Sequence, residues 1–255
     1  MSIFGAVLAW LVDPSHWVGY AGIPTRLLEH LYYSGSALLV GIVIAVPLGA
    51  LVGHTGRGGF FVVGFANGLR SLPDLGLLIL LVLLVGIGLL PVVVALAVLA
   101  VPPLLAGTYA GVRNVDRSVV DAARGMGMRE RDVLLRVELP NALPLLLGGL
   151  RAATLQVVAT AAIAAYVSFG GFGRYIIDGL SVQDYPQMAS GAILVAVLAL
   201  IIEAALAGVQ RAVVSPGLRA PSGRTRPPPE LDTKLPHTPK ADDRPAPEMA
   251  GVNPS

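Results

Sequence analysis

The sequence contains no cysteine and little charge. Without cysteine among its 255 residues, the chain cannot form disulfide bonds, thiolate zinc sites or iron–sulfur clusters. Charged residues make up 13% of the chain, about half the share of a typical soluble domain, whereas hydrophobic residues make up 55%. Long apolar runs without an interrupting charge are typical of a polytopic helical membrane protein, so we expect an all-α fold in a lipid bilayer.

Sequence motifs for several kinds of chemistry are also missing. There is no Gly-x-x-x-x-Gly-Lys-Ser/Thr loop, so the chain itself is not expected to bind ATP phosphates. The four histidines, at positions 16, 30, 54 and 237, do not have the spacing of metal ligands. The net charge of +2 does not come from one basic stripe, so no nucleic-acid partner is expected. We expect neither an enzyme nor a cofactor or metal site in this chain.

Five apolar stretches are long enough to be transmembrane helices. They cover residues 27–52, 60–86, 92–109, 144–167 and 188–213, and a connection rich in glycine and aromatic residues, 169–186, joins the last two. We therefore expect a membrane domain over residues 25–213. Gly148, Gly149, Ala152 and Ala153 in the fourth stretch are small enough to allow close helix packing.

The two ends of the chain differ from this domain. Residues 1–24 contain one apolar run, 3–12, which is short for a membrane span. Trp10 and Trp17 favour an interfacial helix there, over a tilted span or a cleaved segment. Residues 214–255 are rich in proline and poor in large apolar residues, so we expect a disordered tail. A passive tail is the simpler interpretation; the alternative is a tail that binds a partner or anionic lipid through Arg219, Arg224 and Arg226.

The distribution of arginine predicts an orientation in the membrane. The interval 113–151 carries seven arginines, and Arg57 and the arginines after the last span fall on the same side of a five-span bundle. The opposite side has only Arg26 and Arg174. The positive-inside rule then places the loop 113–140 and the C-terminus in the cytoplasm and the N-terminus outside.

The longest charge-rich interval between apolar runs, 116–151, has the pattern of a helical hairpin. A short amphipathic helix is followed by a Gly-Met-Gly-Met break and by a second segment, 133–139, that ends at Pro140. Gly125 and Gly127 can adopt backbone conformations that other residues avoid, and proline suits the first turn of the next helix. A polar hairpin between two spans indicates a docking site in the aqueous phase; the alternative is a solvated loop lying on the lipid surface.

This hairpin resembles the EAA loop of permease subunits of binding-protein-dependent ABC importers. The family pattern is Glu-Ala-Ala, three residues, Gly, nine residues and Ile-x-Leu-Pro, and the chain has the same spacing with Asp for Glu and Val for Ile. In that family the loop is the coupling helix, which inserts into a groove of the ATPase subunit. The resemblance implies that the ATPase-coupling residues are Asp121, Ala122, Ala123, Gly125, Gly127, Val137, Leu139 and Pro140.

Other segments are similar to the osmoprotectant permeases, which import glycine betaine, carnitine, choline and related solutes. These segments are residues 66–73, Gly86-Ile87-Gly88 followed by Pro91, residues 122–128, residues 137–140 and residues 170–173. The resemblance covers residues 29–213. The sequence departs from the usual pattern at Arg70 and Asp74, where Gln or Thr and Ala are usual, and at Ser168-Phe169.

Arg70 lies well inside the second apolar stretch, where an unpaired charge costs a few kcal/mol or more. It either faces a polar path or extends its side chain to the cytoplasmic surface. Asp74, four residues further along, could pair with it on a helix, and Pro73 would free backbone carbonyls to line a cavity. Glu203 is a weaker candidate of the same kind. The translocation-path candidates are Arg70, Pro73, Asp74, Gly170, Gly171 and Gly173.

The resemblance implies the type I ABC importer permease fold, with five core spans and a short interfacial helix, in the bacterial cytoplasmic membrane. It also implies alternating access driven by separate ATPase subunits that hold ATP and Mg²⁺. The other implied partners are an extracytoplasmic solute-binding protein and a second permease, either identical or related. Two alternatives stay open: an importer of methionine, phosphonate or aliphatic sulfonates, and a membrane scaffold or sensor that transports nothing.

Overall fold

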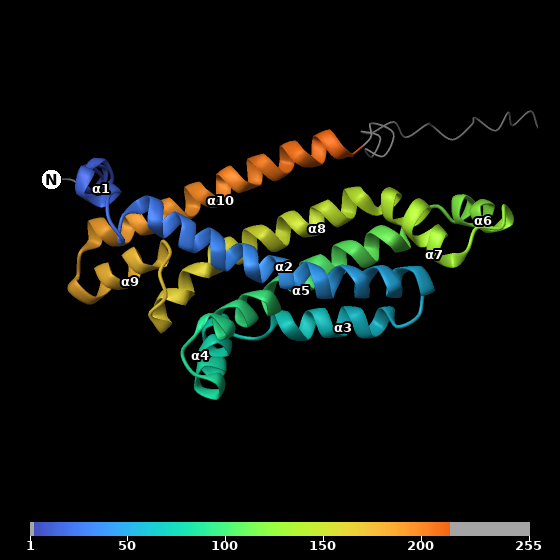
Figure 1. The fold of residues 1–255 in the computed structure, drawn as a ribbon, viewed down its shortest axis with the longest axis horizontal. Helices are drawn as coiled ribbons and strands as arrows, with labels where there is room; N and C mark the ends of the chain where they lie inside the picture. The colour runs from blue at the N-terminus through green and yellow to red at the C-terminus, as the bar shows by residue number, and fades with distance from the viewer. Residues whose placement is uncertain (1–2, 215–255) are drawn as a thin grey trace, which may run out of the picture. The chain divides into compact units, whose positions relative to one another are not determined.

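The computed structural model describes residues 3–214, in which every regular element is a helix (Figure 1). In chain order the elements are α1 (Ile3–Val12), η1 (Pro14–Trp17), α2 (Ile23–Thr55), α3 (Gly59–Arg70), α4 (Asp74–Val85), α5 (Leu89–Arg113), α6 (Arg117–Gly125), α7 (Glu130–Val133), η2 (Leu134–Glu138), α8 (Leu139–Thr160), η3 (Ala161–Val167), α9 (Gly173–Val182) and α10 (Tyr185–Val213). The all-α expectation is confirmed. The predicted disordered tail, apart from Val214, lies outside the described residues.

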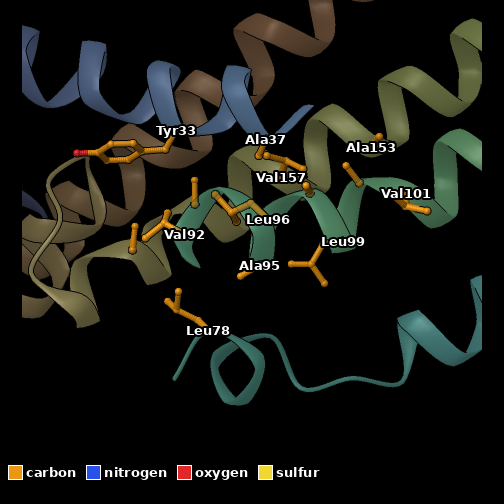
Figure 2. Close-up of a cluster of buried hydrophobic side chains, with 14 of the residues drawn as sticks. Tyr33, Ala37, Leu78, Val92, Ala95, Leu96, Leu99, Val101, Ala153 and Val157 are labelled. Atoms are coloured by element: carbon orange, nitrogen blue, oxygen red, sulfur yellow. The ribbon is translucent and has the colours of Figure 1, made fainter. Parts of the chain in front are cut away.

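Helix α5 is the centre of the membrane domain. In its most apolar stretch 67% of the residues are buried, against 6% in α10, which is peripheral. Helices α2 and α8 pack on α5, and Figure 2 shows Leu96 of α5 near Ala37 of α2 and Val157 of α8. Helix α5 carries apolar side chains on all its sides because it is surrounded by other helices rather than by water. This core positions the helix ends on which the candidate site is built.

Small residues let the central helices approach closely. A Cβ atom built on Gly107 of α5 would lie 2.7 Å from the Cα of Gly149 in α8, and one on Gly49 of α2 would lie 2.9 Å from the Cβ of Thr108. Such crossings need glycine because the two backbones leave no room for a side chain. The expectation of close packing holds for Gly149 and for Ala153, which is fully buried. The other pair, Gly148 and Ala152, is exposed in this single chain, so close packing there stays a prediction.

The second predicted span, 60–86, is not one continuous helix. It is divided into α3 and α4, which meet at an angle of 86° across residues 71–73. Pro73 has no N–H and disfavours a helical conformation at the preceding residue, and the N–H of Ser71 instead bonds the carbonyl of Gly68 in a tight turn at 3.2 Å. Counting this bent pair as one span gives five candidate spans; without it there are four.

The helix that contains the fourth predicted span begins before that span. Residues 130–167 form one helical run of 38 residues that includes α7, η2, α8 and η3. Pro140 lies in the first turn of α8, as expected, but no break separates α8 from the turns before it. Just before it, η2 is a π-helix in which the N–H of Leu139 bonds the carbonyl of Leu134. This wider turn adapts the helix to a proline, which cannot donate the usual hydrogen bond. The predicted hairpin arm is therefore continuous with the membrane helix that follows it.

Helix α1 has the predicted length and lies crosswise to α2 and α10 (Figure 1). Trp10 points toward the bundle, where its ring meets that of Tyr175 edge-on at 5.1 Å and stacks on His16 at 4.0 Å. Trp17 is half exposed and donates its indole N–H to the carbonyl of Leu11. Trp10 thus anchors α1 to α9 rather than to the surroundings. Its location at the membrane interface stays a prediction.

Candidate functional site

The predicted docking hairpin is formed by α6, α7 and the turn between them. Its first helix is capped by Asp116, whose side chain accepts a hydrogen bond from the N–H of Ser118 at 2.9 Å. Val120 and Ala123 on one face of α6 are buried against Val133 of α7, which is fully buried. The hairpin therefore has a small apolar core of its own, and the opposite face of α6 is open.

The turn of the hairpin depends on one of its two glycines. Gly127 has a φ of +82°, a conformation in which other residues are strained. The N–H of Met128 bonds the carbonyl of Ala123 at 3.2 Å and that of Gly127 bonds the carbonyl of Arg124 at 2.9 Å, which is the Schellman pattern of a helix end. Gly125 is the last residue of α6 and has no positive φ, so the expectation of a special conformation there is wrong.

Only one of the two alanines of the motif is exposed. Ala122 lies on the open face of α6 together with Asp121, whereas Ala123 is 3% exposed and belongs to the hairpin core. A helix turns by about 100° per residue, so neighbouring positions point in different directions. Ala122 can therefore face a partner while Ala123 faces the hairpin core. Met126, in the Gly-Met-Gly-Met break that follows, is 77% exposed.

A network of charged side chains connects the hairpin to the end of α2. The imidazole of His54 lies with Nδ1 2.5 Å from Oε2 of Glu138 and with Nε2 3.1 Å from Oε2 of Glu130. Arg124 of α6 in turn makes two 3.0 Å hydrogen bonds to the carboxylate of Glu130, and these hold the pKa of Glu130 below its ordinary value. Four elements, α2, α6, α7 and η2, thus meet in one network.

Sequence reasoning missed this network. His54 and Glu138 are 84 positions apart, and no local sequence pattern predicts that they pair. A usable signal was the position of Glu138 between the apolar residues Val137 and Leu139. An acidic residue in such a motif is expected to be buried, and a buried acid needs a partner. A polar cavity of about 260 Å³ opens beside the network, and its lining includes His54, Glu138 and Arg117.

Arg70 and Asp74 do not form the predicted pair. The helix ends between them, so they are not one turn apart, and no ion pair joins them in the described part of the chain. Arg70 is exposed and lines a hollow of about 290 Å³ together with Asn67 and Tyr109. Pro73 lies at the bend, as its predicted effect on the helix requires. Whether these residues line a path for solute stays a prediction.

The glycines at 170–173 are packed tightly against neighbouring elements. Gly171 has a φ of +81°, and its N–H donates to Oε2 of Glu29 in α2 at 2.8 Å. A Cβ atom on Gly170 would collide with the carboxylate of Glu29, and one on Gly173 would collide with the backbone of Ala162. These contacts explain why the segment contains glycine. A role in the path is an additional prediction.

Two charged residues on the membrane helices form a pair that was not predicted. Arg151 lies inside α8, although the sequence analysis grouped it with the arginines of the loop. Its guanidinium pairs with the carboxylate of Glu203 in α10, and its Nη1 donates to Gln210 at 2.7 Å. Gln210 also donates to the carbonyl of Pro144 at 3.1 Å. Pairing explains how an apolar span tolerates Arg151, and it gives Glu203 a structural role.

Within residues 3–214, no group of three or more metal-ligating side chains lies close enough together to hold an ion. The charged clusters described above consist of carboxylates matched with arginine or histidine. What they provide is attachment between helices.

Comparison with known proteins gives a consistent result. The family model of binding-protein-dependent transport system inner membrane components matches residues 38–219. A carnitine transport permease protein of Listeria monocytogenes is 35% identical over 191 residues, which are 75% of this chain and 88% of that protein. A glycine betaine/carnitine/choline transport system permease protein of Bacillus subtilis is 36% identical over the same shares.

The fold also matches solved structures. A chain of the methionine ABC transporter in an inward-facing conformation superposes with a TM-score of 0.68 and 24% identity, over 80% of this chain and 99% of that chain. This likeness confirms the predicted permease fold.

Proposed function

The chain belongs to the family of binding-protein-dependent transport system inner membrane components, and from that membership we propose that it is the permease subunit of an ABC importer for osmoprotectants. The solutes are glycine betaine, carnitine, choline or related quaternary ammonium compounds. Support for this solute class comes from the two relatives described above, whose names specify these solutes and whose length this chain covers to 88%.

The observation that carries the docking part of the proposal is the open face of α6. This helix is held on one side by the hairpin core and presents Asp121 and Ala122 on the other. A short, rigid helix with a small residue at its centre suits a groove on an ATPase subunit. The partner subunits hold ATP and Mg²⁺ and hydrolyse the nucleotide, whereas this chain contributes the docking surface.

The route from the docking site into the membrane follows the continuous helical run of residues 130–167. Because no loop interrupts this run, a displacement of the hairpin is transmitted directly to α8. ATP-driven closure of the ATPase pair then biases the permease pair between inward-open and outward-open arrangements. An extracytoplasmic binding protein delivers solute at the opposite face, to a path between this chain and a second permease, identical or related.

The proposal includes an orientation. The hairpin and the C-terminus lie in the cytoplasm, and the N-terminus lies outside. Arg113, Arg117 and Arg124 support this, because all three line the hollow beside the hairpin, and a cluster of arginines next to membrane spans favours the cytoplasmic side.

Transport by the assembled complex is the decisive test. The chain is co-expressed with the ATPase and binding protein from the neighbouring genes, reconstituted in vesicles, and supplied with radiolabelled betaine, carnitine or choline. We expect uptake that requires both ATP and the binding protein, with radiolabelled methionine as the negative control. Uptake of methionine alone would show that the solute class is wrong, and ATP hydrolysis without uptake of any solute would favour the scaffold alternative.

A further inference from the structure

The end of α2 beside the hairpin carries one polar side chain that is nearly buried. His54 lies in the last turn of α2, with its side chain 11% exposed. Gly56 ends the helix there in a left-handed conformation, and its N–H bonds the carbonyl of Val52.

Both ring nitrogens of His54 face carboxylates that come from different elements. Nδ1 meets Glu138 of η2 and Nε2 meets Glu130 of α7, at 2.5 and 3.1 Å. Glu138 is 6% exposed, so this contact is largely shielded from water. The imidazole thus bridges two carboxylates, through a charge-assisted hydrogen bond to Glu138 and a close contact with Glu130.

The bridge reaches the docking helix itself. Glu130 binds His54 and is also held by two hydrogen bonds to Arg124 of α6. In the covalent chain α6 is adjacent to α5 on one side and to the 130–167 run on the other, and α2 is distant in sequence. The path from α6 through Arg124, Glu130 and His54 therefore gives the docking helix a direct attachment to α2.

The other end of α2 is attached to the glycine segment. Glu29 accepts a hydrogen bond from the N–H of Gly171 at 2.8 Å and pairs with Arg26 at 2.9 Å. With 33 residues, α2 is about 50 Å long, enough to cross a bilayer. A single helix is thus attached near its two ends to two different parts of the chain, the hairpin and the segment 170–173.

We propose that His54 is a positioning residue for transport, which makes α2 move with the docking hairpin and so carries the motion to the glycine segment at the far end. This rests on the proposed function, because it takes α6 to be the ATPase-docking helix. In this scheme α2, like α8, transmits the movement of the hairpin across the domain, and His54 attaches α2 to the hairpin. Neither ATP hydrolysis nor solute binding involves His54 directly.

The test compares His54→Gln, whose side chain is neutral, with His54→Lys, whose ammonium group can still pair with the two carboxylates. Each variant is reconstituted with the ATPase and binding protein, and uptake and ATP hydrolysis are measured in the same vesicles. We expect His54→Gln to assemble normally but to take up about tenfold less solute per ATP, the factor expected from losing roughly one charge-assisted hydrogen bond. His54→Lys should retain most of the coupling. Thr55→Ala is the matched control, since that hydroxyl bonds only Leu51 in its own helix, and it should behave as the wild type.

Two results would overturn the proposal: unchanged uptake per ATP in His54→Gln, or equal losses in His54→Gln and His54→Lys. Amide hydrogen exchange on the full-length permease tests the attachment without transport. His54→Gln should speed exchange in α6 and α7, and unchanged rates would show that the bridge does not hold the hairpin. If wild-type vesicles transport no solute, the proposed function fails and the coupling role with it, whereas the exchange rates still decide whether the attachment exists.

Discussion

At the scale of single residues, two nearby glycines of the docking hairpin differ in backbone conformation. Gly127 needs its left-handed backbone for the hydrogen bonds that end α6, whereas Gly125 has an ordinary helical conformation. A Cβ atom on either would meet nothing within 4 Å. Substitution at these two positions therefore isolates the effect of backbone conformation from that of crowding.

Gly127→Ala should destabilise the end of α6, and Gly125→Ala should stabilise it. A left-handed alanine costs about 1–2 kcal/mol, whereas replacing a helical glycine by alanine gains about 0.5–1 kcal/mol. Amide hydrogen exchange in α6 is the measurement: the rates should rise in the first variant and fall in the second. The same direction of change in both variants would contradict the assigned conformations.

At the scale of elements, the helices are joined by two kinds of contact. Close glycine crossings hold α2 and α8 to α5, and they need small residues at the points where the backbones meet. The peripheral helix α10 is attached differently, through the pair of Arg151 with Glu203 and the hydrogen bonds of Gln210. These polar contacts add to the apolar packing of Leu198 and its neighbours on one face of α10.

Glu203→Gln should weaken the attachment of α10 by about 1–3 kcal/mol, because it leaves Arg151 without a counter-charge in an apolar span. The side chains are partly exposed, at 31% and 28%, which keeps the expected loss below that of a fully buried pair. Unfolding titrations in mixed detergent micelles measure it. The double variant Arg151→Met with Glu203→Gln should recover most of the stability. A double variant as unstable as the sum of the singles would show that the two side chains do not interact.

At the scale of the whole molecule, the structure describes one membrane domain with polar clusters near both ends of α2. The hairpin network lies where α2 and α5 end, and the Glu29 contact with the glycine segment lies at the other end of α2. With α2 and α8 both leading from the hairpin toward the opposite side, a movement of the docking helix has two parallel routes through the domain.

The orientation of this domain is open to a simple labelling test. The natural sequence has no cysteine, so single-cysteine variants need no altered background. Tyr20 is 86% exposed near the N-terminus, and Ala122 is exposed on α6. In intact cells an impermeant maleimide should label Tyr20→Cys, and it should label Ala122→Cys only after the membrane is permeabilised. Labelling of Ala122→Cys from outside would invalidate both the orientation and the docking role.

Much of this description follows from local sequence. The apolar stretches, the amphipathic helix before a glycine break, and the bend at Pro73 depend on residues close together in the chain. Hydrophobicity over about 20 residues decides whether a segment enters a bilayer, and this sum does not depend on neighbouring helices. The docking hairpin was therefore predictable, including Gly127, whose conformation follows from its place at a helix end.

Other features depended on which helices meet. Tertiary packing determined that Ala123 faces inward, that Arg151 and Glu203 pair across two helices, and that His54 lies between Glu130 and Glu138. A charge in a sequence indicates that a partner is needed, but residues 52 or 84 positions apart become partners only through the packing of α2, α8 and α10. The sequence by itself thus determined the membrane fold and the docking hairpin. Only the tertiary structure decided how that hairpin is attached to the rest of the protein, because ion pairs between helices depend on distances that local patterns do not encode.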